Sequence, residues 1–147
     1  MNKLSEIEIK KMIGVAIEAR KNAFSFRSGH SIGACVLTRR GEYFGGCNTE
    51  GVISSMGVCA EMSAIDHAVV HGNYEFKAVL VIDENNFVYP CGACRQYMAQ
   101  FYKVDDQDIE IVVAKESGEY RKSTLLKLLP EVFLTTIFKE KIRAFKK

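Results

Sequence analysis

Three cysteines and one glutamate constrain the fold of this chain more than any other feature of its sequence. Cys59 stands two residues before Glu61, and the segment Pro90-Cys91-Gly92-Ala93-Cys94 follows after an apolar run over residues 77–82. Three thiolates with this spacing can hold one zinc ion and leave its fourth position open for water. The fold is therefore expected to bring the two cysteine segments together around one ion.

Glu61 is close enough to the first thiolate to move the protons of that water without occupying the metal. Hydrolysis at neutral pH needs a nucleophilic water, which zinc supplies, and a proton carrier, which a carboxylate supplies. Three thiolates give the zinc ion a net negative charge, which weakens its effect on the water. Helix N-termini at both cysteine segments, and the guanidinium of Arg95, are expected to offset that charge.

Other interpretations of the cysteines stay open at this point. A Cys-x-x-Cys pair is also typical of structural zinc sites and of redox-active dithiols. A structural site would need a fourth protein ligand, for which the sequence offers Cys35, Cys47, His30, His67 and His71. Cys35 and Cys47 fall in predicted strands, where a free cysteine is usually a small buried residue. His67 and His71 fall one turn apart on a predicted helix, away from its metal end. A redox role would leave Cys59 and Glu61 without a function.

The distribution of apolar residues predicts a series of helices and strands. Ser5 and Glu8 form a capping box before a helix that ends near Asn22. Two strands, 34–38 and 43–47, are expected to form a hairpin, followed by a loop over 48–57. The other expected elements are helix 59–71, strand 77–82, helix 91–102, strand 109–114, a short helix over 124–129 and a last helix over 136–145. This order predicts an α/β fold, a three-layer α/β/α sandwich with a mixed central sheet, in one domain of residues 1–147.

Composition narrows the choice of partners. Hydrophobic residues make up 48% of the chain and charged residues 26%, which is ordinary for a soluble globular protein. The net charge of +2 gives no basic footprint for nucleic acid, and no apolar run is long enough to cross a membrane. An N-terminus without an apolar signal core and an odd count of five cysteines predict a cytoplasmic protein with free thiols.

In type and order, the motifs resemble those of the small zinc-dependent cytidine deaminases that use three cysteines. The resemblance implies hydrolytic deamination of cytidine or 2′-deoxycytidine, with Glu61 as the catalytic residue and Zn²⁺ held by Cys59, Cys91 and Cys94. It also implies a homotetramer, with a dimer as the smaller alternative. The matching motifs are Gly33-Ala34, Gly46-Cys47-Asn48-Thr49-Glu50, Cys59-Ala60-Glu61, Pro90-Cys91-Gly92-Ala93-Cys94-Arg95-Gln96 and Leu128-Leu129-Pro130-Glu131-Val132-Phe133.

The same resemblance assigns substrate contacts. Asn48 and Glu50 correspond to residues that hold the sugar hydroxyls, and Ala60 is expected at the substrate as well. Phe133 corresponds to an aromatic residue that a neighbouring subunit places against the base, although a phenylalanine of the core is the alternative. His30 occupies a position where these enzymes usually have a phenylalanine flanking the pyrimidine.

The chain also departs from the family pattern. Residues 51–55 read Gly-Val-Ile-Ser-Ser in place of Asn-Ala-Ser-Tyr-Gly, and Met62 follows the catalytic glutamate where an arginine is common. Arg95 is then expected to offset more of the thiolate charge. Two alternatives follow: a deaminase of another aminated pyrimidine nucleoside, similar to blasticidin S deaminase, or a non-catalytic protein with the deaminase fold. Polynucleotide deaminases are disfavoured by Cys59 and by the near-neutral charge.

Overall fold

Helices and strands succeed one another along residues 3–145, the part of the chain that the computed structural model describes. The sheet has the strand order β2-β1-β3-β4-β5. β3 and β4 are parallel, and every other neighbouring pair is antiparallel, so the sheet is mixed. In chain order the elements are α1 (Glu6–Arg20), β1 (Gly33–Thr38), β2 (Tyr43–Cys47), the 3-10 turn η1 (Ser54–Met56), α2 (Ala60–Val70), β3 (Phe76–Asp83), α3 (Gly92–Asp105), β4 (Glu110–Lys115), β5 (Tyr120–Thr124), α4 (Leu125–Leu128) and α5 (Thr136–Ala144).

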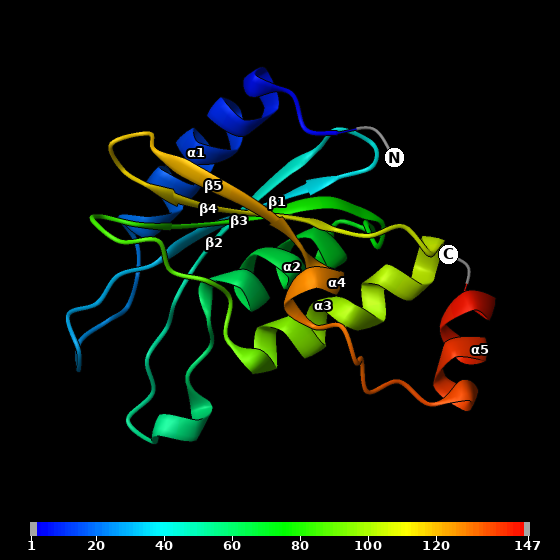
Figure 1. The fold of residues 1–147 in the computed structure, drawn as a ribbon. Helices are drawn as coiled ribbons and strands as arrows, with labels where there is room; N and C mark the ends of the chain where they lie inside the picture. Colours follow the sequence, from blue (N-terminus) through cyan, green and yellow to red (C-terminus); the bar gives the residue numbers. More distant parts are fainter. Residues whose placement is uncertain (1–2, 146–147) are drawn as a thin grey trace.

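Helices cover both faces of this sheet, with α1 on one side and α2 and α3 on the other (Figure 1). Strands β1 and β3 are buried along almost their whole length, because their alternating side chains enter two different cores. On the side of α1, Met12 packs with Leu37 and Leu80; on the other side, Ile65 and Met98 belong to the core that α2 and α3 cover. The predicted three-layer α/β/α sandwich is confirmed.

Most predicted elements are present, but one strand was missed. The hairpin of β1 and β2, the capped first helix and the two buried strands lie close to their predicted places. β5 was not predicted, and the short helix begins at Leu125 after that strand. The sequence Tyr-Arg-Lys-Ser-Thr has little apolar character, because β5 is an edge strand whose residues are exposed or half-buried. Its pairing with β4 depends on a tertiary contact and not on a local apolar pattern.

A close approach between β2 and α2 places the first cysteine segment. A Cβ atom on Gly46 would lie 2.3 Å from the backbone nitrogen of Ala64 and 2.6 Å from the carbonyl oxygen of Ala60. Only a residue without a side chain lets the strand approach the first turns of the helix this closely. Gly46 therefore sets the position of the N-terminus of α2, where Cys59 and Glu61 lie.

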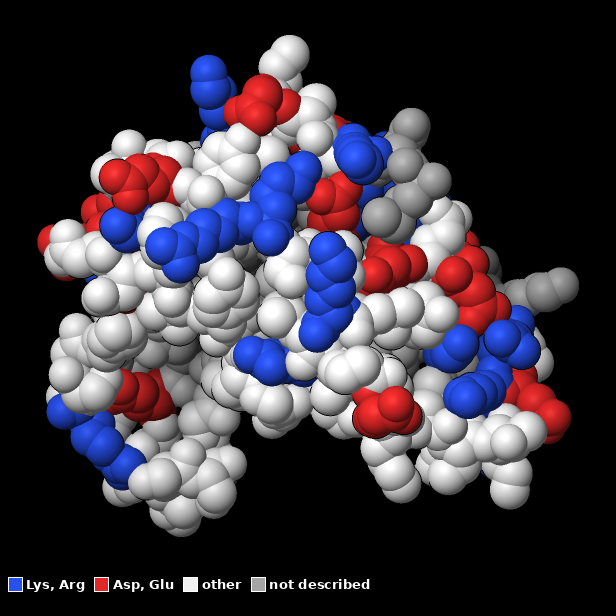
Figure 2. Space-filling model, in the orientation of Figure 1, with Lys and Arg blue, Asp and Glu red and all other residues white. Residues whose placement is uncertain are grey.

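The surface carries both signs of charge. Figure 2 shows basic side chains over the middle of one face, with acidic side chains beside them. Within residues 3–145, no helix is both long enough and apolar enough to span a lipid bilayer.

Candidate active site

The three cysteines meet where the N-termini of α2 and α3 approach each other. Cys59 immediately precedes α2, Cys91 immediately precedes α3, and Cys94 lies in the first turn of α3. Their sulfur atoms all lie within 4.8 Å of one another, and the Sγ atoms of Cys59 and Cys91 are 3.9 Å apart. Because the free backbone N–H groups of a helix point out of its N-terminus, both helices favour negative charge on these sulfurs.

This cluster suits a zinc ion with an open coordination position. Thiolates are soft ligands that zinc binds well, and three protein ligands are typical of catalytic sites. Among the described residues, no further Cys, His, Asp or Glu side chain joins the group. The fourth ligand that a closed structural site requires is therefore not supplied by this part of the chain.

The other candidate ligands are engaged elsewhere. Cys35 is buried in β1, and its thiol donates to the carbonyl oxygen of Val36 at 3.6 Å. The Nδ1 atom of His67 lies 2.9 Å from the carbonyl oxygen of Gly45, and both His67 and His71 pack their rings against Phe44 with centroids 5.2 Å apart. These two histidines support the packing of α2 on the edge strand β2.

Glu61 is buried beside the thiols. Its relative exposure is 5%, and the Cys94 thiol hydrogen-bonds to its carboxyl group. Two other carboxyl groups in residues 3–145 are buried, and each has a basic partner: Asp83 pairs with His30, and Glu110 pairs with Lys122. Glu61 has no such ion pair among the described residues and faces the sulfur atoms instead.

Burial and hydrogen bonds between the thiols set the pKa values in this cluster. Desolvation raises the pKa of Glu61 to about 7, and the negative charge of Cys59 acts in the same direction. Hydrogen bonds from Cys94 and then Cys91 lower the pKa of Cys59 to about 6 against the opposing effect of burial. The hydrogen bond to Cys59, followed by burial, raises the pKa of Cys94. Of Cys59 and Cys94, it is Cys59 whose pKa is lowered, so hydrogen bonds from its neighbours favour its thiolate form.

Arg95 holds the loop that carries the second cysteine segment. Its Nε donates to the carbonyl oxygen of Pro90 at 2.7 Å, and its Nη1 donates to the carbonyl oxygen of Leu128 at 3.0 Å. These bonds connect the residue before Cys91 to α4. The predicted electrostatic effect of Arg95 on the thiolates stays a prediction, whereas its role in fixing this loop is visible in its contacts.

Asn48 and Glu50 line a cavity of about 320 Å³ together with Cys59. The amide of Asn48 is oriented by two bonds: its Oδ1 accepts from the N–H of Ile32, and its Nδ2 donates to the carbonyl oxygen of His30, both at 2.9 Å. The fold therefore places the two predicted sugar-binding residues next to the first predicted metal ligand.

The carboxylate of Glu50 also closes a turn in the chain that precedes β1. It accepts from the backbone N–H groups of Arg27 and Ser28 at 2.7 and 3.1 Å, and from the Ser28 hydroxyl. The guanidinium of Arg27 continues across the cavity to the Ser54 hydroxyl and the Val52 carbonyl oxygen. These hydrogen bonds, led by that of the Ser28 hydroxyl, hold the pKa of Glu50 below its usual range.

His30 makes its ion pair with Asp83, at the end of β3. The Nε2 of His30 lies 3.1 Å from the Oδ1 of Asp83. Neither Asp83 nor Arg27 is among the site residues that the sequence predicts. An acidic residue directly after the apolar residues of a central strand is a usable signal for Asp83, because functional side chains gather at strand ends. Arg27 carries no comparable signal, since its contacts come from a loop distant in sequence.

Phe133 lies on the surface with a relative exposure of 73%. Its carbonyl oxygen accepts from the Nε2 of Gln96 at 2.7 Å, which anchors the segment after α4 to α3. Phe133, Met62 and Phe138 line a cavity of about 520 Å³ between α3 and α5. Phe133 is therefore not a core residue of this chain.

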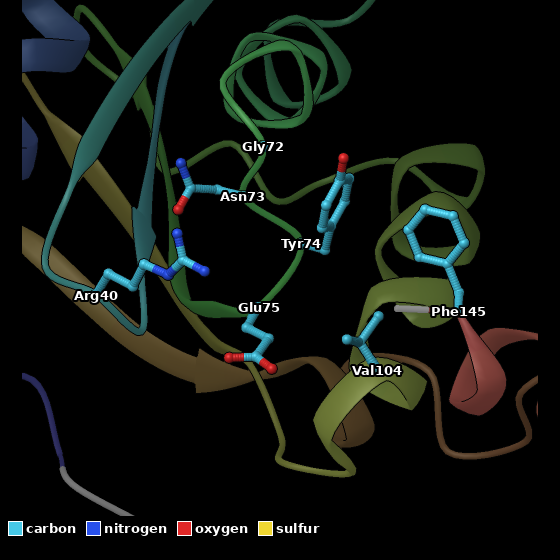
Figure 3. Close-up of a pocket in the computed structure, with 7 residues that line it drawn as sticks. All are labelled: Arg40, Gly72, Asn73, Tyr74, Glu75, Val104 and Phe145. Atoms are coloured by element: carbon cyan, nitrogen blue, oxygen red, sulfur yellow. The ribbon is translucent and has the colours of Figure 1, made fainter. Parts of the chain in front are cut away.

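A further cavity, of about 310 Å³, lies at the other end of α2 from the cysteines. Figure 3 shows Arg40 and Asn73 on one side of it and the ring of Phe145 on the other. None of the residues predicted to act in catalysis or binding belongs to its lining, which consists of Arg40, Gly72, Asn73, Tyr74, Glu75, Val104 and Phe145.

Comparisons with known proteins agree with this site. The family model described as the cytidine and deoxycytidylate deaminase zinc-binding region matches residues 7–107. A cytidine deaminase from Sporosarcina psychrophila is 35% identical over 128 residues, which cover 86% of this chain and 92% of that protein. A blasticidin-S deaminase from Bacillus cereus is 31% identical over 110 residues, covering 69% of this chain and 75% of that protein.

A solved structure has the same fold as this chain. The crystal structure of a cytidine deaminase from Burkholderia pseudomallei superimposes with a TM-score of 0.77 at 32% identity, covering 88% of this chain and all of that one. Together with the three converging cysteines, the family match confirms zinc as the cofactor. The chain therefore belongs to the cytidine and deoxycytidylate deaminase family of zinc-dependent enzymes.

Proposed function

We propose that this enzyme hydrolyses cytidine and 2′-deoxycytidine to the corresponding uridines with release of ammonia. The observation that carries the proposal is the buried carboxyl group of Glu61 beside three cysteine sulfur atoms, which no fourth potential protein ligand joins among residues 3–145. A structural zinc site has no use for such a carboxyl group, and burying it without a basic partner costs stability. Its retention favours catalysis over the non-catalytic alternative.

Different residues of the chain would bind the metal, transfer protons and contact the base. Cys59, Cys91 and Cys94 would hold the zinc ion, which when bound makes a water molecule nucleophilic at neutral pH. Glu61 would take a proton from the attacking water and deliver it to the ring nitrogen N3. It would then carry the second proton of that water, from the hydroxyl group added at C4, to the departing 4-amino group, which leaves as ammonia. Ala60, buried between Cys59 and Glu61, would line the base.

Asn48 and Glu50 are proposed to bind the sugar hydroxyls. Asn48 uses one N–H of its amide on His30 and keeps a second N–H for the substrate. Glu50 accepts from three groups of residues 27–28, and a carboxylate has about four acceptor positions, so a sugar hydroxyl can still be accommodated. Arg95 as a compensating charge and His30 beside the pyrimidine stay predictions from the family resemblance, and for His30 the contact with Asp83 favours a positioning role instead.

Exposed apolar residues near α5 form a surface that assembly into an oligomer would bury. Phe133, Phe138 and Ile137 are all more than half exposed, and Phe133 and Phe138 line a mostly apolar cavity between α3 and α5. Large exposed apolar groups that cluster in this way mark interaction surfaces. We propose a homotetramer, with a dimer as the smaller alternative, in which Phe133 reaches the base bound in a neighbouring subunit.

The remaining proposals concern the chain as a whole. Residues 1–147 are proposed to form one deaminase domain, and its location is proposed to be cytoplasmic, since all five cysteines are free thiols. The partners are a small pyrimidine nucleoside and water, without nucleic acid or membrane.

Blasticidin S is the second candidate substrate, because Met62 follows Glu61 where the cytidine enzymes often have arginine and because the blasticidin-S deaminase of Bacillus cereus is a relative. An ammonia-release screen of the purified zinc enzyme across cytidine, 2′-deoxycytidine, cytosine, cytidine 5′-monophosphate and blasticidin S decides between them. Cytidine and 2′-deoxycytidine are expected to be turned over fastest. A higher kcat/KM for blasticidin S, or no release from either nucleoside, would contradict the proposal.

A further inference from the structure

The segment of residues 24–32 lies beside the proposed sugar site and is held there by contacts from several parts of the fold. The N–H of Phe24 donates to the carbonyl oxygen of Asn48, and the carbonyl oxygen of Phe24 accepts from the N–H of Glu50. The Glu50 carboxylate accepts from the N–H groups of residues 27–28. Arg20 of α1 donates from Nε to the carbonyl oxygen of Ser31 at 2.7 Å. This segment therefore borders the cavity that Asn48 and Glu50 line, and its residue Arg27 belongs to the cavity wall.

Asn48 has no freedom to turn within this wall. Its amide oxygen accepts from the N–H of Ile32, and its amide nitrogen donates to the carbonyl oxygen of His30. If the amide were rotated by half a turn, its oxygen would face the carbonyl oxygen of His30 and its N–H group would face the N–H of Ile32. Neither of these pairs can form a hydrogen bond. The direction of the remaining N–H of Asn48 is consequently fixed by the backbone position of residues 30–32.

The side chain of His30 is in turn held by Asp83. One carboxylate oxygen of Asp83 accepts from Asn85 N–H at 2.9 Å, from Asn86 N–H at 2.8 Å and from the Asn86 amide at 3.2 Å. The other oxygen lies 3.1 Å from the Nε2 of His30. Asp83 has a relative exposure of only 4% at the end of a central strand, so it is a rigid anchor for an otherwise exposed histidine.

We propose that His30 and Asp83 form a positioning pair that holds Asn48 in the orientation required by the sugar hydroxyls of the substrate. The pair acts through the carbonyl oxygen of His30 and touches no reacting atom. Its effect should appear as binding energy that is equal in the ground state and the transition state, so it should change KM and leave kcat unaltered. The inference rests on the proposed role of Asn48 as a sugar ligand.

Three variants and two substrates test the proposal. His30→Ala removes the ion pair, His30→Gln keeps an N–H donor at a similar distance from the backbone, and Glu84→Gln is a matched control. Glu84 follows Asp83 in sequence and lies 3.6 Å from Nη2 of Arg20, whose separate bond from Nε to Ser31 does not involve Glu84. Steady-state kinetics are measured on each zinc-loaded enzyme with cytidine and with 2′,3′-dideoxycytidine, which lacks both ring hydroxyls of the sugar.

For His30→Ala the expected result is a KM for cytidine raised about fivefold, the upper end for a partly exposed ion pair, with kcat unchanged. The KM for 2′,3′-dideoxycytidine should stay within error of the wild type, because the hydroxyls that Asn48 binds are absent. His30→Gln should recover most of the wild-type KM, and Glu84→Gln should behave as the wild type with both substrates.

Two outcomes would overturn the proposal. Equal losses on both substrates, without recovery in His30→Gln, would mean that the imidazole ring acts on the pyrimidine and not through Asn48. An unchanged KM for cytidine in His30→Ala would mean that the pair does no positioning. Asn48→Ala separates this failure from that of the underlying assignment: a raised KM for cytidine in that variant keeps Asn48 as a sugar ligand, whereas an unchanged KM removes both the assignment and the positioning pair.

Discussion

At the scale of single residues, the proposed chemistry depends on groups that the fold has removed from water. Glu61 is buried beside three thiols, and Asn48 has one amide direction imposed on it by Ile32 and His30. The sequence predicted the cysteines and Glu61 because metal ligands need fixed residue types at restricted spacing. It could not predict Arg27, whose contacts with Val52 and Ser54 join segments far apart in the chain, whereas the place of Asp83 at the end of an apolar strand was a usable signal.

Glu50→Ala is expected to lower kcat/KM for cytidine about tenfold or more, because a hydrogen bond between a charged group and a sugar hydroxyl is lost. The loss on 2′,3′-dideoxycytidine should be much smaller. Glu42→Ala is the control, since Glu42 is an exposed glutamate of the β1–β2 turn and does not line the cavity. Equal losses on the two substrates would show that Glu50 supports the fold of residues 27–28 and does not bind the sugar.

Asp83 should make the protein sensitive to acid. Burial acts to raise the pKa of Asp83, but the hydrogen bonds from Asn85 and Asn86, helped by His30, outweigh it and hold the pKa below its usual range. A carboxyl group with a lowered pKa in the folded state stabilises that state above the unfolded value, near pH 4, and this contribution is lost as the pH falls through the folded value.

The expected result is that Asp83→Asn lowers the thermal unfolding midpoint at pH 6 and that the difference from the wild type shrinks towards pH 3. Unfolding followed by circular dichroism across this range provides the measurement. A difference that stays constant with pH would mean that the ionised form of Asp83 adds no stability to the fold.

At the scale of elements, the site exists because two helices begin at the same place. The predicted helices and buried strands were recognisable from capping residues, apolar runs and glycines that end helices. The edge strand β5 was not recognisable from the sequence, because Tyr120–Thr124 gains its conformation from pairing with β4. The close contact of β2 with α2 was also not predictable, since a glycine in a strand has several possible explanations.

Gly46→Ala is expected to lower the free energy of unfolding by about 1–3 kcal/mol, because the added Cβ would overlap backbone atoms of α2. Cytidine turnover should fall as well, since the N-terminus of α2 carries Cys59 and Glu61. The control is Gly14→Ala in α1, where a Cβ meets nothing within 4 Å and a small gain in stability is expected. Denaturant unfolding of both variants checks this, and equal behaviour would contradict the close-contact argument.

At the scale of the whole molecule, the aromatic surface around Phe133 has no partner within the described residues. We expect sedimentation equilibrium to give the mass of a tetramer. Phe138→Glu, which places a charge on this surface, should produce smaller species.

Phe133→Ala should keep the assembly but raise the KM for cytidine, because the ring is proposed to reach a neighbouring base. A fully active monomer would exclude both the assembly and the role of Phe133.

The most direct test of the central claim combines metal analysis with turnover in the wild type and in Glu61→Gln. Both proteins should contain one zinc ion per chain, since Glu61 is not a ligand, while Cys91→Ser should lose most of its zinc. Cytidine deamination by Glu61→Gln should fall on the order of 10²–10⁴-fold, towards the upper end because one carboxyl group serves several proton transfers. A Glu61→Gln enzyme that keeps its zinc and retains near wild-type turnover would contradict the assignment of Glu61 as the proton carrier.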